Sequence, residues 1–372
     1  MRSAKSAMED TGQRRARRAW FVVGALMLLL VGVVVWIVSL TWSPAGGGPV
    51  EIAIDPLADV ASRFGGLDDL SVWVLDADHP QFGGFSGLAV AGDRWLALSD
   101  RGWFWEATLG RDAGGRPTGF VGSRMVPLLD VDGMPVEGIS RRDAEELVVA
   151  PDGFWVAFEQ DHRLAFHSGA DLDGPAVVVP APDGLAGIGG DSNKGIEALV
   201  QLGDGSLLAI HEGTPGGAAR DQEATWQAWL RSEPRSAGAR WRPGSIPRQG
   251  PFRPTAATVV APIDESGAAE TREAVLMLQR HYDRERDETR VRLVRLLGDP
   301  RVDVALGERE LARFEAPFPV DNFEALASEP TADGVRLFIL SDDNFSDAQR
   351  TLLVVGELRR SSLSEASAGR AR

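Results

Sequence analysis

An acidic hairpin near the C-terminus constrains the fold of this chain more than any other stretch. Residues 321–345 read DNFEALASEPTADGVRLFILSDDNF, and they contain two short apolar runs joined by a turn that ends in Asp-Gly. Two such runs around a glycine-bearing turn predict an antiparallel β-hairpin. Glu324 precedes the first run, and Asp342 and Asp343 follow the second, so the hairpin brings these acids together at its open end. Carboxylates at such separations raise each other's pKa unless a cation lies between them.

The same pattern occurs three more times upstream. Each copy has an opening residue before the first apolar run and an acid after the second. The copies are residues 86–102, with Ser86 and Asp100; residues 145–160, with Glu145 or Glu146 and Glu159; and residues 196–213, with Glu197 and Glu212. They start roughly fifty to sixty residues apart, a spacing that is typical of propeller blades and other repeat arrays. Because one hairpin cannot bury its own faces, the units are expected to pack against each other.

Further short strands surround these hairpins and indicate an all-β fold. They are expected at residues 69–76, 104–109, 119–129, 164–167, 176–180, 225–231, 239–242, 257–261, 274–280, 290–297 and 351–357. Only residues 308–314 suggest a short helix. We therefore predict a β-propeller of five or six blades, of which five can be counted, since a β-sandwich would not repeat an acidic signature. The strand at 69–76 is expected to complete the last blade beside 351–357 and so close the ring.

The N-terminal part predicts a membrane anchor. Residues 19–42 carry no charge, and this length fits one transmembrane helix and exceeds the apolar core of a usual signal peptide. The arginines lie on its N-terminal side, so residues 1–18 are expected in the cytoplasm and the rest outside, with the chain inserted once in the plasma (inner) membrane. A cleaved signal peptide is the alternative. Residues 43–66 are then a linker, 67–358 the propeller domain and 359–372 a disordered tail.

Charge and cysteine content exclude several classes of function. The first eighteen residues carry a net charge of +4, so the remainder carries −19 of the total of −15. Such an acidic domain argues against nucleic acid as a partner. The absence of cysteine excludes a disulfide framework, a thiolate zinc site and a cysteine nucleophile. The sequence leaves the oligomeric state open.

The repeated acids define a candidate site. Because the inner strands of a propeller converge on its axis, these acids should surround one mouth of the channel. Oxygen ligands from several strands suit a hard cation, and calcium is preferred over magnesium. The predicted metal ligands are Asp100, Glu159, Glu212, Asn322, Asp342 and Asp343, and the predicted catalytic acids are Glu145, Glu197 and Glu324. The interleaved residues Arg101, Lys194, His211 and Arg280 are predicted to bind a small anionic or ester substrate.

Three hypotheses follow for the function. The first is metal-assisted hydrolysis of a phosphoester or carboxylic ester at the channel mouth. The second is a membrane-tethered binding or scaffold propeller in which calcium is structural. In the third, the acids merely cap strand ends, but this role does not require acid at both ends of each hairpin. The tryptophans at 95, 103, 105 and 155 are expected to pack between blades.

Several of these motifs resemble a known family. They are GGFSGL (83–88) with LSDRG (98–102), DAEEL (143–147) with DGFWVAFEQ (152–160), NKGIEAL (193–199) with HEG (211–213), and DNFEAL (321–326) with SDDNF (341–345). Residues 81–357 thereby resemble the phytase-like domain family, also described as having esterase-like activity of phytase. The resemblance implies a propeller fold and an ester or phosphoester hydrolase. One departure is Leu278-Gln279-Arg280, where family members tend to have an LER-like element, so an amide replaces an acid.

Overall fold

The described part of the chain forms one propeller. The computed structural model describes residues 47–57, 64, 66–169, 171–183, 185, 194–213, 225–261 and 273–363. All of them belong to the second of two units, Gly47–Arg372. The predicted cytoplasmic segment 1–18 and membrane segment 19–42 lie outside the described residues. Within the described part, none of the helices has the length and apolar character needed to cross a bilayer.

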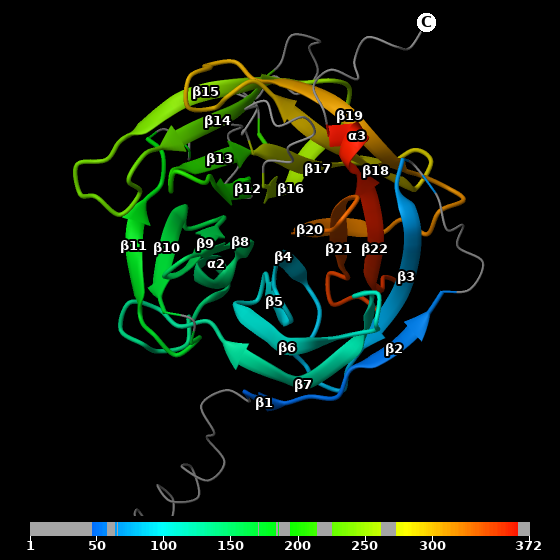
Figure 1. Cartoon of the computed structure of the whole chain (residues 1–372). Helices are drawn as coiled ribbons and strands as arrows, with labels where there is room; N and C mark the ends of the chain where they lie inside the picture. The colour runs from blue at the N-terminus through cyan, green and yellow to red at the C-terminus, as the bar shows by residue number, and fades with distance from the viewer. Residues whose placement is uncertain are drawn as a thin grey trace, which may run out of the picture. The chain divides into compact units, whose positions relative to one another are not determined.

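Five antiparallel sheets form the blades and surround a common axis (Figure 1). Blade 1 contains β4 (Phe85–Ala91), β5 (Arg94–Ser99), β6 (Trp103–Arg111), β7 (Pro117–Pro127) and the edge strand β1 (Gly48–Pro49). Blade 2 contains β8 (Ala144–Ala150), β9 (Gly153–Phe158), β10 (Arg163–Ser168) and β11 (Ala176–Pro180), and the short helix α2 (Ile139–Arg142) precedes it. Blade 3 contains β12 (Ile196–Gln201), β13 (Leu207–His211), β14 (Thr225–Arg231) and β15 (Trp241–Pro247).

The last two blades follow the same order from the axis outward. Blade 4 contains β16 (Arg253–Val260), β17 (Ala274–Asp283), β18 (Glu288–Leu297) and β19 (Gly307–Phe314). Blade 5 contains β20 (Asn322–Pro330), β21 (Gly334–Asp342), β22 (Thr351–Arg359), β3 (Asp68–Asp76) and β2 (Ala53–Pro56), and α3 (Arg360–Leu363) follows β22. The innermost strands are β4, β8, β12, β16 and β20. The all-β fold and the five counted blades are therefore confirmed.

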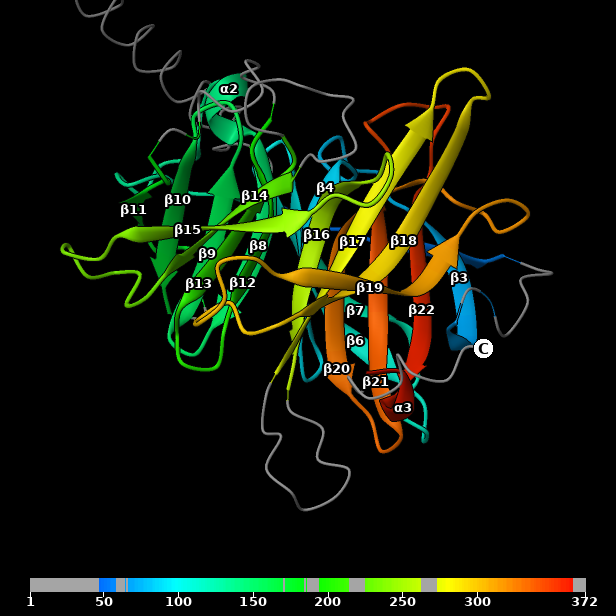
Figure 2. The same cartoon turned by 90° about the horizontal axis from the view of Figure 1, so that it is seen from above.

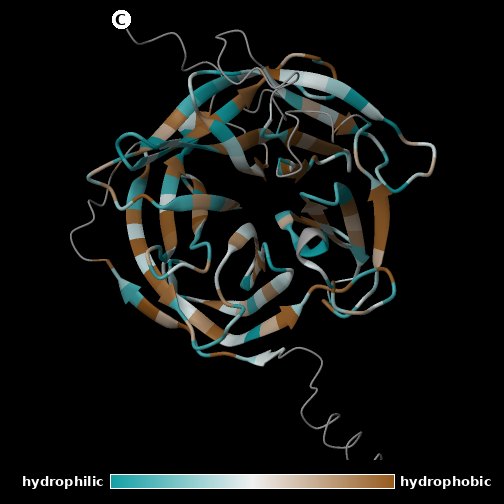
Figure 3. Cartoon of the chain, turned by 180° about the vertical axis from the view of Figure 1, so that it is seen from behind, coloured by the Kyte–Doolittle hydropathy of each residue, from teal (hydrophilic) through white to brown (hydrophobic). Residues whose placement is uncertain are grey.

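Burial between blades explains the near-continuous apolar runs of the second strands. All six residues of β9 and all nine of β21 are buried, because each sheet is covered on both faces by its neighbours. Along many other strands, hydrophobic and hydrophilic residues alternate (Figure 3). Five apolar clusters form the core, one between each pair of adjacent blades. As predicted, Trp95, Trp103, Trp105 and Trp155 are buried in these clusters.

Ring closure also follows the prediction. β3 pairs with β22 in antiparallel register, with Leu75 opposite Thr351, so a strand that precedes all of blade 1's four main strands in the sequence completes the last blade. The hairpin of β20 and β21 has Asn322 opposite Asp342 at one end and Pro330 opposite Val335 at the other. We call the end of the channel that contains Asn322 and Asp342 the mouth. In Figure 2 it is the end that carries α2, and α3 lies at the opposite end.

Three local predictions differ from the structure. Residues 307–314 form β19 rather than a helix, because Ala312 and Phe314 alternate with outward side chains and the strand pairs with β18. Part of the predicted linker 43–66 forms β1 and β2, which extend the outer edges of two blades. At the predicted tail, Leu363 is buried and Arg309 Nη2 donates to the Ser362 carbonyl at 2.8 Å. Residues 364–372 lie outside the described part.

Candidate functional site at the channel mouth

Every inner strand has a β-bulge at the same position. In each blade, one residue near the mouth has no partner on the second strand, and we call it the opening residue. These residues are Ser86, Glu145, Glu197, Thr255 and Glu324. A bulge leaves its extra residue unpaired and turns its side chain away from the regular sheet direction. The structure thus assigns Glu145, rather than Glu146, to the repeated acid position.

Two further positions repeat beside each bulge. The residue two places before the opening residue lies in the inner strand or in the loop leading into it. It pairs with a residue at or near the end of the second strand, which we call the closing residue. These pairs are Gly84 with Asp100, Asp143 with Glu159, Gly195 with Glu212, Arg253 with Arg280, and Asn322 with Asp342. Each blade therefore presents three comparable side chains or glycines at the mouth. The closing residues include the predicted Asp100, Glu159, Glu212, Arg280 and Asp342.

The glycines in this frame make room for the acids. Gly84 has φ +60°, and a Cβ there would lie 2.4 Å from Asp100 Oδ1. A Cβ on Gly195 would lie 2.9 Å from Glu159 Cγ in the neighbouring blade. Larger residues at either position would displace a closing carboxylate. These contacts give a physical reason for the glycine in the GGF and KGI segments.

The two hydroxyl opening residues hold the next blade. Ser86 Oγ donates to the carbonyl of Ala144, directly before the Glu145 bulge. Thr255 Oγ1 donates to the carbonyl of Phe323, directly before the Glu324 bulge, at 3.0 Å. The hydroxyls of blades 1 and 4 therefore help to position the opening acids of blades 2 and 5.

The opening acids of blades 2, 3 and 5 meet at the mouth, as the sequence predicts. Burial, followed by the charges of Glu197 and Glu159, raises the pKa of Glu145 well above its usual range. Burial and Glu212 do the same for the pKa of Glu197, which also experiences the charge of Glu324. Burial likewise raises the pKa of Glu324. The acids that are distant in sequence therefore act on one another within a single bowl.

A second group of acids lies across blades 5 and 1. Burial and the charge of Asp342 raise the pKa of Asp100 to about 7. Burial and the charge of Glu324 raise the pKa of Asp342 to about 8. Near neutral pH these carboxyl groups retain protons unless a positive charge replaces them.

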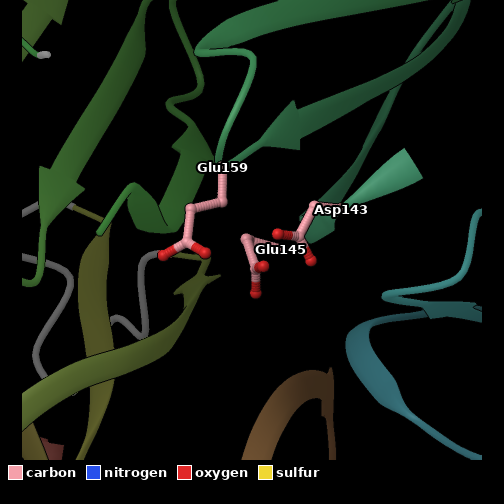
Figure 4. Close-up of side chains that lie close together, drawn as sticks. All are labelled: Asp143, Glu145 and Glu159. Atoms are coloured by element: carbon pink, nitrogen blue, oxygen red, sulfur yellow. The ribbon is translucent and has the colours of Figure 1, made fainter. Parts of the chain in front are cut away.

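Two overlapping sets of carboxylates have the spacing of a metal site. In Asp143, Glu145 and Glu159, one oxygen from each lies within 4.8 Å of the others (Figure 4). The same holds for Glu159, Glu197 and Glu212, so Glu159 belongs to both sets. Asp143 was missed as a candidate, although its place two residues before the bulge in DAEEL was the available signal.

The donor atoms fit a hard cation. Both sets offer only carboxylate oxygens, the ligands that calcium prefers. On the blade 5 side, Asn322 is 6% exposed, and its Nδ2 donates to Asp342 Oδ2 at 3.1 Å. Its Oδ1 is buried and accepts no hydrogen bond from the described residues. A buried amide oxygen without a donor is costly, and a cation would supply the missing partner.

Basic residues lie directly beside the acids. Arg280 Nη2 contacts Glu324 Oε1 at 3.0 Å, as expected for a cation at the mouth. Burial raises the pKa of Glu212, while Arg253, Arg280 and, to a smaller extent, Lys194 act to lower it. Arg253 Nη1 lies 3.5 Å from Glu212 Oε2 and was missed, because the sequence of blade 4 has no acidic signature to point to it.

The structure does not support a substrate-binding role for His211. The ring is buried, and its Nδ1 accepts the Gly213 N–H at 2.7 Å, which leaves Nε2 as the donor to the Lys194 carbonyl at 3.0 Å. Burial lowers the pKa of His211 to about 4, so the ring is neutral at physiological pH. With both nitrogens bound to backbone groups, His211 holds together the two segments that carry Lys194 and Glu212.

Two other predicted residues shape the loop after β21. Asp343 Oδ1 accepts the N–H groups of Gly84 (2.9 Å) and Phe345 (3.0 Å), and its Oδ2 accepts the Thr351 hydroxyl (2.7 Å). Its oxygens are therefore occupied, which speaks against the predicted role as a metal ligand. The Arg101 guanidinium lies over the Phe345 ring at 3.2 Å from the centroid, next to Asp100.

Two buried polar residues link strands behind the mouth. Glu146 is fully buried, and its carboxylate accepts the N–H groups of Leu147 (3.0 Å) and of Ala257 in blade 4 (3.1 Å). Gln279 is also fully buried, donates to Glu308 at 2.7 Å and accepts from Arg292 at 2.7 Å. The amide that departs from the family pattern thus lies inside the sheet of blade 4.

Fold and site together define a five-bladed propeller with an acid-rich mouth. The chain belongs to the family described as "Phytase-like: Esterase-like activity of phytase", whose pattern matches residues 80–345. The predicted family membership is therefore confirmed. No curated protein matches the chain.

Two solved structures show a distant likeness. The PQQ-bound aldose sugar dehydrogenase of Streptomyces coelicolor is 13% identical, with 83% of this chain and 99% of that chain covered and a TM-score of 0.38. The allergen Mala s 1 of Malassezia sympodialis is also 13% identical, with 82% and 92% covered and a TM-score of 0.40. At these TM-scores, neither likeness carries an argument about function.

Proposed function

We propose that this protein is a metal-assisted hydrolase of phosphoesters or carboxylic esters, with its active site at the mouth. The observation that carries the proposal is the meeting of Glu145, Glu197 and Glu324 from three blades, beside Arg280 and two carboxylate sets of ligand spacing. If the acids served only to solvate the mouth, so many carboxyl groups would not be buried close to one another. Each raised pKa indicates an environment that is unfavourable to the charged form.

The geometry suggests a division of roles among the acids. Glu145 and Glu197 each belong to a carboxylate set, so they would hold the cation together with Glu159. A bound divalent cation polarises an ester oxygen and lowers the pKa of a coordinated water. Glu324 contacts Arg280 and belongs to neither set, which suits it to act as the general base. Its raised pKa brings it closer to neutral pH, where a carboxylate accepts a proton more effectively.

Calcium is the proposed cation, since the ligands are oxygens from several separate strands. The uncharged segment 19–42 and the arginines before it support a further part of the proposal. In it, the propeller is tethered to the plasma (inner) membrane on the extracytoplasmic side. The substrate would then be a small anionic or ester compound that reaches the mouth from solution.

Hydrolysis of an aryl phosphate and an aryl acetate by the full chain, with calcium or with chelator, tests the proposal. We expect turnover with calcium, and a loss of about 100-fold or more in kcat for Glu324→Gln. Asp333→Asn, at the other end of the same hairpin, is the matched control and should retain activity. Thermal melting shows whether each variant is folded.

The outcomes separate the competing functions. Stabilisation by calcium without turnover of either substrate would overturn the hydrolase and favour a scaffold propeller with structural calcium. A melting temperature that chelator does not change, again without turnover, would overturn both functions. Full activity of Glu324→Gln would remove Glu324 from the catalytic role.

A further inference from the structure

The outer edge of blade 2 is left open by the described part of the chain. β11 lies at the rim of the propeller (Figure 1), and no described strand pairs with its outer edge. In blades 1 and 5, β1 and β2 cover the fourth strands, β7 and β3. In blade 3, the Ser245 N–H of β15 donates to the Val304 carbonyl, and Leu306 donates to the Ser245 carbonyl, both at 2.8 Å. β11 has no comparable cover.

β11 also lacks the charges that protect an exposed edge. Ala176–Pro180 reads AVVVP, whereas β19, the fourth strand of blade 4, reads GERELARF. Charged side chains on an edge strand oppose pairing with another chain. Val177 and Val178 are 57% and 45% exposed. The free edge of blade 2 is therefore apolar as well as open.

A neighbouring turn extends this apolar surface. Within residues 128–136, the Asp130 N–H donates to the Met134 carbonyl at 2.7 Å and closes a tight turn. The Asp130 carbonyl accepts the N–H of Ala176, the first residue of β11, at 3.0 Å. Val131 and Met134 of this turn are 48% and 55% exposed. They continue the exposed valines of β11 at the outer side of blade 2.

Val178 carries the free hydrogen-bonding groups of this edge. The Ala176 N–H points away from β10, since it donates to Asp130, and every second residue of a strand points the same way. The N–H and C=O of Val178 therefore face outward. At the other end of β11, Pro180 has no N–H, and its carbonyl accepts Trp241 Nε1 at 2.9 Å. No described residue outside the sheet bonds to the backbone of Val178.

We propose that β11 pairs with β11 of a second copy of this chain, antiparallel and with a two-fold axis at Val178. In this register, each Val178 N–H donates to the Val178 carbonyl of the other copy, so the edge is complementary to itself. Val177 of each copy would lie opposite Val179 of the other. The inference is independent of the proposed hydrolase function.

The blocked ends and the charge of the domain favour a second copy over another protein. An extended peptide gains affinity from a row of backbone hydrogen bonds, but this edge offers the groups of one central residue. A second β11 has the same restriction and needs no longer row. The chain after residue 18 carries a net charge of −19, so two copies repel each other over most of their surface. The uncharged β11 is a place where they can meet.

Cysteine crosslinking of the full chain tests the inference, because the wild type contains no cysteine. In the proposed register, the two Val178 Cα atoms lie about 5.5 Å apart, within reach of a disulfide, and the two Val177 Cα atoms about 7–8 Å apart. Under mild oxidation, Val178→Cys should form a covalent dimer about tenfold faster than Val177→Cys, although Val177 is more exposed. Val302→Cys, at a turn of blade 4, is the control for random collision.

Sedimentation of the full chain in detergent measures pairing without a cysteine. Val178→Pro removes the outward N–H, and Val178 makes no hydrogen bond to β10, so the blade should remain folded. We expect the dissociation constant of the dimer to rise about tenfold or more, with an unchanged melting temperature. Val178→Thr keeps the N–H and the shape of the side chain, and it should dimerise like the wild type.

Three results would overturn the inference. They are equal disulfide formation at positions 177, 178 and 302, a dimer that Val178→Pro does not weaken, and a wild-type chain that stays monomeric at all concentrations. Slow hydrogen exchange of the Val178 N–H in such a monomer would show that another segment of the same chain covers the edge. Dimerisation that depends on Val178 supports the inference whether or not the chain hydrolyses an ester.

Discussion

Blades 2 and 4 share one backbone design and differ in charge. Both have a bulge at the opening position and a closing residue that faces the inner strand. The three positions hold Asp143, Glu145 and Glu159 in blade 2, and Arg253, Thr255 and Arg280 in blade 4. The comparison teaches that the bulge determines where a side chain meets the channel, whereas the residue type determines which ion that blade can attract. The same backbone frame thus carries acids in one blade and arginines in another.

A carboxylate of blade 2 also contacts blade 4. Glu146 of blade 2 accepts the backbone N–H of Ala257 in blade 4 at 3.1 Å, behind the mouth. Its neighbour Glu145 faces the acids of the mouth. Adjacent glutamates in one strand therefore serve different purposes, one as a link between blades and one as part of the site.

The largest effect is expected from replacing Glu159, the residue of blade 2 that both carboxylate sets share. Glu159→Gln removes the carboxylate common to both sets, so calcium affinity should fall by about 100-fold. Arg280→Gln, at the equivalent position of blade 4, should leave calcium affinity unchanged or higher. Calorimetric titration with calcium measures both, and Asp152→Asn at the far turn of blade 2 is the control. Equal losses in the two variants would contradict the proposed difference between the blades.

A smaller effect, on the free energy of unfolding, is expected from replacing the neighbouring residues Glu145 and Glu146. Glu146→Ala leaves the buried N–H of Ala257 without its acceptor, which should lower the free energy of unfolding by about 2 kcal/mol. Glu145→Gln should instead raise it in the calcium-free protein, because glutamine lacks the ionisable group that burial and the neighbouring acids disfavour. Denaturant unfolding in chelator measures both changes, and Glu146→Gln, which retains an acceptor oxygen, should lie nearer the wild type. Destabilisation of equal size by Glu145→Gln would contradict these roles.

The smallest effect concerns pH. The folded-state pKa values of Asp100 and Asp342 are raised to about 7 and about 8 from an ordinary value of 3.8. Their contribution to stability is therefore fully present below the ordinary value and is lost as pH rises through about 7 to 8. In chelator, the melting temperature should fall by a few degrees between pH 6 and pH 9.

Calcium and one substitution provide the controls for this pH effect. In the wild type, calcium should make the melting temperature less dependent on pH, because it supplies the missing positive charge. In chelator, Asp342→Asn should reduce the fall of the melting temperature with pH. Removing a cation of blade 4 by Arg280→Gln should steepen it, because Arg280 lowers the pKa of Glu324. A melting temperature that rises over this pH range in chelator would contradict the assignment.

The sequence predicts the ring because its hairpins repeat in full. Paired apolar runs with a closing acid recur in four of the five blades, and three of these hairpins also have an Asp-Gly turn, so the fold and the closure by β3 follow from local pattern. Blade 4 has strands of similar length but no acid at the three repeated mouth positions, which hold Arg253, Thr255 and Arg280. Arg253 and Thr255 were therefore missed, since their meaning depends on structural equivalence to residues in other blades.

Roles within the site were less predictable than its location. His211 and Asp343 have residue types that suit a site, but the structure shows their polar atoms bound to backbone groups and to a threonine. A sequence indicates which atoms are available and cannot indicate which partners occupy them. Residues 308–314, which belong to β19, were predicted as a short helix because a run of seven residues with few apolar positions fits both periods.

Closure of the ring by β3 and β22 has a consequence for chain order. Both ends of the propeller lie in one sheet, since the first full strand pairs directly with the last. Once β3 and β22 are joined, the polypeptide could begin in a loop between two other blades. The three repeated positions of each blade would then keep their places at the mouth. A circular permutant that starts between blades 3 and 4 should therefore build the same bowl, which separates the architecture of the mouth from the order in which its parts are synthesised.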